Sequence, residues 1–146
     1  MKPIKVILVC LCAAFILSCS QKDAVNPASK VSDTQVVGRW NLIRIVNGFA
    51  QSTTIPSEVG ISEVIEYKAD GTYQRNYTDT FGQHEEKGNF YTGANPTKTA
   101  DKQAVFYPDD KTAQPYTFQD GHLFLYQRGS QDATIADGST YEYQRQ

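Results

Sequence analysis

The feature that most constrains the fold is a series of short runs rich in Val, Ile, Thr, Tyr and Phe, which begins after residue 36. Gly, Asp, Asn and Pro separate the runs, and no window there repeats its apolar residues with the 3.6-residue period of an amphipathic helix. Side chains alternate within several runs, a period of two that is typical of strands with one buried face. The sequence therefore predicts an all-β domain with eight strands, at 37–46, 62–68, 72–78, 83–91, 102–107, 114–119, 122–128 and 139–145.

Tight turns join two pairs of these strands. Ala69-Asp70-Gly71 separates the second strand from the third, and Asp120-Gly121 separates the sixth from the seventh. Asp and Gly both tolerate the positive φ angles that tight hairpin turns require. Strands joined in this way predict a small eight-stranded antiparallel up-and-down barrel, because closing the meander removes its exposed edges. An open sandwich is the competing architecture.

The first eighteen residues are expected to be a signal peptide, residues 1–18. Lys2 and Lys5 supply a basic start, and residues 6–17 form an unbroken apolar run. Crossing about 30 Å of hydrocarbon takes about twenty apolar residues, so this run is too short to span a membrane. Its length matches the apolar region of a secretory signal.

The segment Ile16-Leu17-Ser18-Cys19 resembles the lipobox of bacterial lipoproteins. The resemblance implies that Cys19 becomes the first residue of the mature chain and carries acyl chains, which hold the protein to a membrane. Cys10 and Cys12 would leave with the signal, so acylation would take up the one remaining thiol. The alternative is an ordinary secreted protein cut near Ser18.

Residues 19–35 are expected to be a flexible tether, since they are polar and show no sustained period. Ser20-Gln21-Lys22-Asp23 resembles the surface-export signal of Bacteroidetes-type lipoproteins. We therefore expect an outer-membrane protein on the periplasmic face or, as this segment favours, on the cell surface. Without residues 1–18 the chain keeps twelve basic and sixteen acidic residues, a net charge of −4. With no basic run, it is not expected to bind nucleic acid.

Three segments in the last 111 residues resemble lipocalin-like domains. Gly38-Arg39-Trp40 is similar to the Gly-X-Trp motif that opens their first strand, Glu66 to Tyr73 is similar to one of their hairpins, and Thr140 to Arg145 is similar to their closing strand. The resemblance covers residues 36–146. It implies a lipocalin-like barrel in which Trp40 closes one end and an arginine of the last strand covers its ring.

The strand directions indicate which arginine this is. In an up-and-down barrel the last strand ends where the first begins, so Arg145 should lie over Trp40, whereas Arg128 should lie at the opposite rim. We therefore expect Gly38, Trp40 and Arg145 to form the base of the barrel. A solvated terminal Arg145 is the alternative.

The opposite end should be open and formed by the connections 47–61, 79–82, 108–113 and 129–138. The first connection is the longest and resembles a lipocalin-like lid, although it could instead seal the core. A barrel of eight strands is filled by side chains or holds one small ligand. We expect a shallow, partly filled cup for a small apolar or amphipathic ligand, although core packing is the alternative for each candidate. The candidate ligand-binding residues are Phe49, Ile55, Tyr67, Tyr73, Tyr77, Tyr116, Phe118, Phe124 and Tyr126, and Phe106 is a further interior candidate.

The chain offers little for catalysis or metal binding. His84 lacks the second histidine of a zincin motif, and His122 follows a tight turn. Glu85 and Glu86 are neighbours on an expected strand, so their side chains point to opposite faces. We therefore expect no enzyme, no metal and no cofactor. The alternative function is a non-catalytic interaction module (an inhibitor, adhesin or envelope-complex subunit) with a filled barrel, whose protein partner the sequence does not identify.

The lipobox interpretation predicts that Cys19→Ser releases the protein from washed membranes into the soluble fraction, because two or more acyl chains are needed for stable anchoring. Fractionation followed by immunoblotting measures this. A variant that stays with washed membranes as fully as the parent chain would contradict the lipobox assignment.

Overall fold

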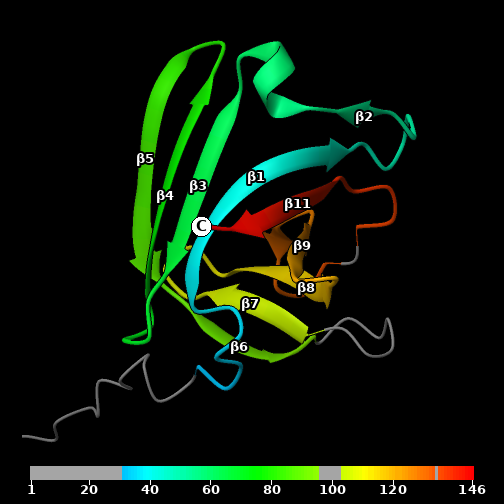
Figure 1. The fold of residues 1–146 in the computed structure, drawn as a ribbon. Coiled ribbons are helices and arrows are strands. Elements are labelled where there is room, and N and C mark those ends of the chain that lie inside the picture. The colour runs from blue at the N-terminus through cyan, green and yellow to red at the C-terminus, as the bar shows by residue number, and fades with distance from the viewer. Residues whose placement is uncertain (1–30, 96–102, 134) are drawn as a thin grey trace, which may run out of the picture.

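The structure, a computed structural model, describes residues 31–95, 103–133 and 135–146. The expected signal peptide and Cys19 lie outside these residues. The described chain forms a curled antiparallel sheet (Figure 1). Its strands are β1 (Gly38–Val46), β2 (Thr53–Thr54), β3 (Ser62–Tyr67), β4 (Thr72–Asp79), β5 (Gly82–Asn89), β6 (Tyr91–Ala94), β7 (Gln103–Tyr107), β8 (Thr112–Gln119), β9 (His122–Tyr126), β10 (Gly129–Ser130) and β11 (Thr140–Arg145), with one 3₁₀ helix, η2 (Pro56–Val59).

The strand order is β5-β4-β3-β1-β11-β9-β8-β7-β6, and the short strands β2 and β10 pair with β1 and β8. Apart from β5 and β6, each long strand pairs with the next long strand in the sequence, and the first long strand pairs with the last, as in an up-and-down meander. The predicted all-β class and strand order are confirmed. The Asp120-Gly121 turn has the positive φ angles expected of it, 52° and 80°. Within the described residues no helix is long and apolar enough to cross a membrane.

The structure differs from the expected fourth strand, 83–91, which divides at Phe90 into β5 and β6. The Phe90 side chain is fully buried, and its backbone N–H donates a hydrogen bond to the Gly71 carbonyl at 2.8 Å. β5 and β6 are therefore consecutive in the chain but occupy the two ends of the hydrogen-bonded order. The Asp109 side chain, in the β7–β8 turn, holds the end of β5, because the backbone N–H of Asn89 donates to Asp109 Oδ2 at 2.8 Å.

The tether was expected to cover residues 19–35, but residues 31–35 contact the domain. The backbone N–H groups of Ser32 and Asp33 donate to Thr92 Oγ1 at 2.9 and 3.0 Å. Thr92 belongs to β6, so this segment covers one end of the sheet. The packed domain therefore includes residue 31 onward rather than beginning at residue 36.

Trp40 closes one end of the interior, as predicted. Its side chain is 1% exposed, and its indole N–H donates to the Val36 carbonyl at 2.7 Å. The Arg145 guanidinium carbon lies 4.3 Å from the centroid of the Trp40 ring. That guanidinium also donates to the carbonyls of Val37 and Gln35, at 2.9 and 2.7 Å. The cation therefore lies over the indole and holds the segment before β1.

Gly38 makes this contact sterically feasible. It has a φ of 146°, which side chains rarely adopt, and a Cβ built on it would lie 2.3 Å from Arg145 Nη1. Any larger residue would push the guanidinium away from Trp40. The three residues of the predicted base therefore act together.

Replacing Trp40 tests the base. We expect Trp40→Ala to lower the free energy of unfolding by about 3–5 kcal/mol, because it removes a fully buried ring. Urea unfolding followed by circular dichroism measures this. Arg39→Ala is the matched control, since Arg39 is exposed and bonds only at the surface to Gln146, and we expect a change within about 0.5 kcal/mol. Equal losses in the two variants would refute the sealing role of Trp40.

Candidate functional site

An interior cavity of about 210 Å³ lies on the same face of the sheet as Trp40, because its lining residue Ile65 pairs directly with Trp40. Strands β3, β4, β7, β8 and β11 and the residues that follow β9 contribute to its wall. The lining residues are Glu63, Ile65, Tyr67, Tyr73, Arg75, Tyr107, Gln114, Gln127, Arg128, Tyr141 and Tyr143.

Alternation along the strands places these side chains. Glu63, Ile65 and Tyr67 occupy every second position of β3, so all three face the interior. In the antiparallel register Tyr67 lies opposite Tyr73, and Ile65 lies opposite Arg75 on β4. Residues directly opposite each other share a face of the sheet. The local strand pattern therefore carries both apolar and charged groups into the cavity.

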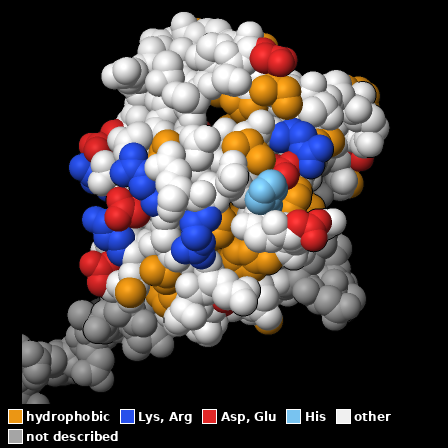
Figure 2. All heavy atoms as spheres, viewed as in Figure 1, with side chains coloured by type: hydrophobic (Ala, Val, Ile, Leu, Met, Phe, Trp, Pro, Cys, Tyr) orange, Lys and Arg blue, Asp and Glu red, His pale blue; other side chains and the backbone are white. Residues whose placement is uncertain are grey.

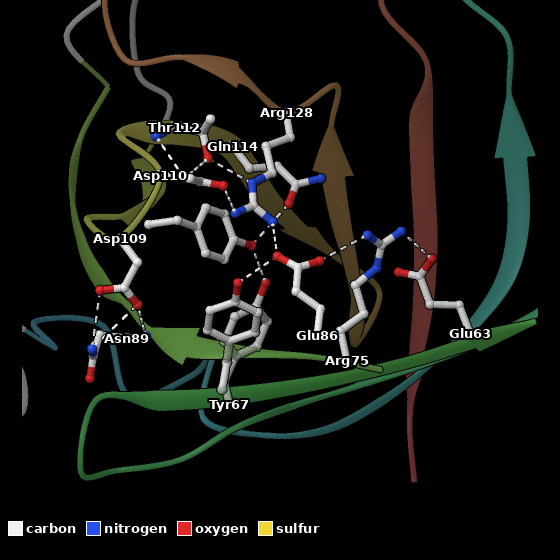
Figure 3. Close-up of polar contacts among 12 residues, drawn as sticks. Glu63, Tyr67, Arg75, Glu86, Asn89, Asp109, Asp110, Thr112, Gln114 and Arg128 are labelled. Atoms are coloured by element: carbon white, nitrogen blue, oxygen red, sulfur yellow. Dashed lines mark hydrogen bonds and ion pairs between the residues drawn. The ribbon is translucent and has the colours of Figure 1, made fainter. Parts of the chain in front are cut away.

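A chain of alternating charges crosses the cavity wall (Figure 3). Arg75 donates to Glu63 Oε2 at 2.7 Å and to Glu86 Oε2 at 3.3 Å. Arg128 donates to Glu86 Oε1 at 2.7 Å and also pairs with Asp110. These ion pairs connect β3, β4 and β5 with the β7–β8 turn and the end of β9. They link β5, at one end of the sheet, to the β7–β8 turn, with which it has no backbone pairing.

Tyrosine hydroxyls satisfy the remaining polar groups of the interior. The hydroxyls of Tyr67 and Tyr107 lie 2.6 Å apart, and Tyr107 donates to Gln114 Oε1 at 3.0 Å. Tyr143 donates to Glu63 Oε1 at 2.5 Å. In the described residues, no buried side-chain nitrogen or oxygen lacks a hydrogen-bond partner. The cavity wall therefore combines apolar ring faces with a polar network whose buried groups are all hydrogen-bonded.

Burial and hydrogen bonding set the protonation of this network. Burial raises the pKa of Tyr107 to about 12 and raises the pKa of Tyr67 well above its ordinary value. Partial burial acts to raise the pKa of Glu86, but hydrogen bonds from Tyr73 and Arg128 outweigh it and hold that pKa below the ordinary value. At neutral pH the wall therefore presents protonated phenols and an ionised carboxylate that is already paired.

Only Tyr67 and Tyr73 among the predicted ligand-binding residues line the cavity. The prediction is wrong for Phe49, which is 85% exposed, and for Ile55, which is also exposed. It is wrong for Tyr77 as well, whose ring stacks on His84 at 4.7 Å outside the cavity lining. The long first connection thus presents its apolar side chains to solvent.

Tyr116 and Phe118 belong to the base instead of the cavity. The ring of Phe118 lies 5.9 Å from Trp40 and 5.7 Å from Tyr116. The Tyr116 hydroxyl donates to Asp33 Oδ2 at 2.7 Å, so the segment before β1 seals this corner. Both side chains face the interior, as expected, but at its packed end.

Phe124 and Tyr126 lie on the outer face of β9. Leu123 and Leu125 are fully buried and occupy the interior face, so the aromatic pair points outward. Alternation alone indicates two faces but does not say which is inner, and the aromatic face was the wrong choice. Phe106 likewise stacks on Tyr91 in a separate cluster, away from the main core.

Sequence reasoning missed most of the charged lining. Glu63 and Arg75 face inward because they share a face with Tyr67 and Tyr73, a signal that alternation did contain. Arg128 was expected at the rim opposite Trp40, and its guanidinium carbon lies 3.7 Å from the centroid of the Tyr107 ring in the cavity wall. Among the described residues, no three His, Cys, Asp or Glu side chains are grouped to hold a metal ion.

Glu86→Gln tests the charge chain. Because the folded-state pKa of Glu86 lies below its ordinary 4.5, its ionised form stabilises the fold at neutral pH, and this contribution is lost as the pH falls through the lowered pKa. We expect a loss of about 1–3 kcal/mol at pH 7, which shrinks as the pH falls from about 5 to about 3. Urea unfolding across this range measures it, with the exposed Glu85→Gln as control. A loss independent of pH would contradict the assignment.

The comparisons with known proteins give likenesses to solved structures alone. No family model matches the chain, and no curated protein sequence matches it. Among solved structures, the chain is similar to the one titled "The Siderocalin Ex-FABP functions through dual ligand specificities", with 11% sequence identity and a TM-score of 0.44. The match covers 77% of this chain and 74% of that chain.

Proposed function

We propose that this protein is a lipid-anchored protein of the bacterial cell envelope whose lipocalin-like barrel binds one small amphipathic ligand. The observation that carries the proposal is the interior cavity with its tyrosine and arginine lining. Pockets that combine apolar walls with a few convergent polar groups are the usual form of small-molecule sites.

The cavity volume limits the size of the ligand. A cavity of about 150 Å³ holds one benzene molecule, so the 210 Å³ here suit a single substituted ring or a short chain. An extended acyl chain would not fit. Of the two ligand chemistries expected from the sequence, the polar wall favours the amphipathic one.

The lining indicates how such a ligand would bind. Its apolar part would pack on Ile65 and on the faces of the tyrosine rings, while a hydroxyl, carbonyl or carboxylate would point toward Arg75 and Arg128. The carboxylates of Glu63 and Glu86 already accept hydrogen bonds from arginine and tyrosine donors. They are poorly placed to act as bases, which supports a binding role rather than catalysis.

The proposed cellular location is argued from the sequence. Acylation of Cys19 would hold the domain at the outer membrane, and the Ser20-Gln21-Lys22-Asp23 segment favours the cell surface. A ligand-binding domain at this location would take up its ligand from outside the cytoplasm.

A titration with 2-phenylethanol tests the proposal, since this probe combines one ring with one hydroxyl. We expect saturable amide NMR shifts at cavity residues such as Tyr141 and Tyr143. Ile65→Phe should abolish them, because the larger ring occupies the cavity. Val64→Phe is the matched control, since Val64 precedes Ile65 on β3 and faces away from the interior. Shifts that survive in a folded Ile65→Phe chain, or that are absent from the parent chain at millimolar probe, would refute the proposed site.

A further inference from the structure

The exposed apolar side chains of this protein gather at one end. The five large exposed ones among the described residues all lie in connections away from the base: Phe49, Ile55, Val59, Phe81 and Ile135. Phe49 and Phe81 are 85% and 90% exposed. Such exposure is common for single side chains, but its restriction to one end indicates an interaction surface.

Four of these residues, Phe49, Ile55, Val59 and Phe81, form what we call the apolar edge. Ser62 pairs with Thr78, which places η2 beside the β4–β5 turn that carries Phe81. Val46 pairs with Thr53, which holds the connection with Phe49 at the end of β1. Figure 1 shows the β4–β5 turn and η2 side by side at the top of the molecule, and β2 leads from η2 to the β1–β2 connection at the right.

The charged residues close to the apolar edge are few and acidic. Glu58 is the single charged residue in 47–61, and the Asp79 carboxylate accepts a hydrogen bond from the Phe81 backbone N–H at 2.7 Å. A strongly charged partner would call for complementary charges, and this segment contains no lysine or arginine. In Figure 2 one acidic side chain lies at this end, and the other charged side chains of this view lie below it, over the sheet.

We propose that the apolar edge docks on a lipid bilayer, with Phe49 and Phe81 inserted at the boundary between headgroups and acyl chains. Apolar side chains among neutral polar groups suit this boundary. The inference rests on the proposed function, which supplies the ligand. Tyr141 of the cavity lining pairs with Ile45 of β1, and Ile45 also pairs with Thr54 of β2, so one wall of the cavity reaches the β1–β2 connection. An amphipathic ligand would then pass between bilayer and cavity.

The length of chain before the domain permits this orientation. Residues 19–30 separate Cys19 from Val31, and these twelve residues can extend about 40 Å. The nine residues of β1 span about 30 Å from the base toward the opposite end. A chain anchored at Cys19 can therefore tip until the apolar edge meets the same membrane, and the anchor raises its effective concentration there.

Vesicle flotation tests docking separately from anchoring. The probe is pure phosphatidylcholine vesicles, and the protein is the chain Ser20–Gln146, which keeps every described residue and lacks the acylation site. We expect this chain to float with the vesicles, and neither added salt nor phosphatidylglycerol should strengthen its binding. Removing each phenylalanine should weaken partition about tenfold, so Phe49→Ser/Phe81→Ser should lose most of it.

Ile135→Ser is the matched control, since Ile135 is exposed but lines a hollow on the outer wall with Ala113 and Pro115. It should bind as the parent chain does. Phe49→Trp gives a second readout, because Trp40 is buried at the base and a new indole should shift its emission to the blue on binding.

Failure of the parent chain to float would overturn docking on a bilayer. That outcome is the one expected of an apolar edge that binds a protein. It is also overturned if the double variant binds equally well, or if binding requires anionic lipid. The 2-phenylethanol titration contains no vesicles, so failure of ligand binding and failure of docking are distinguished.

Discussion

The pairing of the first long strand with the last is the constraint on which the rest of the structure depends. β1 and β11 pair from Trp40 opposite Arg145 to Val46 opposite Thr140. This register brings residues more than a hundred positions apart into contact and stacks the guanidinium on the indole. The stacking contributes about 0.5–2 kcal/mol. Because Gly38 leaves room for Arg145, a three-residue motif and one distant arginine close the base of the interior.

The interior next to the closed base contains charged side chains, among them Glu63, Arg75 and Arg128. Removing one member of a buried ion pair leaves an uncompensated charge and costs several kcal/mol, so such groups have to be satisfied together. Arg75, Glu86 and Arg128 meet this requirement by joining one another, and Tyr73 completes the set. The ion pairs of Arg128 with Glu86 and Asp110 also connect β5 with the β7–β8 turn. Stability and the chemistry of the cavity therefore come from one network.

The two ends of the molecule consequently differ in character. At the base, apolar rings are buried and the segment before β1 packs against β6 and Tyr116. The exposed Phe49 and Phe81 lie in connections at the opposite end, and the cavity lies between, lined by residues of β3, β4 and β11. If the proposed anchoring and ligand binding hold, this asymmetry would bring membrane contact and ligand entry to the same end.

The sequence by itself determined the strand class and the up-and-down order, which follow from local alternation and turn chemistry. The resemblance to lipocalin-like domains indicated the roles of Gly38 and Trp40, and strand direction indicated Arg145. The sequence did not determine which face of β9 is buried. Phe124 and Tyr126 form one face and Leu123 and Leu125 the other, and both faces are apolar. The tertiary structure alone decided that leucines fill the interior there, that Glu63 and Arg75 line the cavity, and that Phe49 stays exposed. The physical reason is that burial depends on what lies opposite a side chain, and those neighbours come from distant parts of the chain.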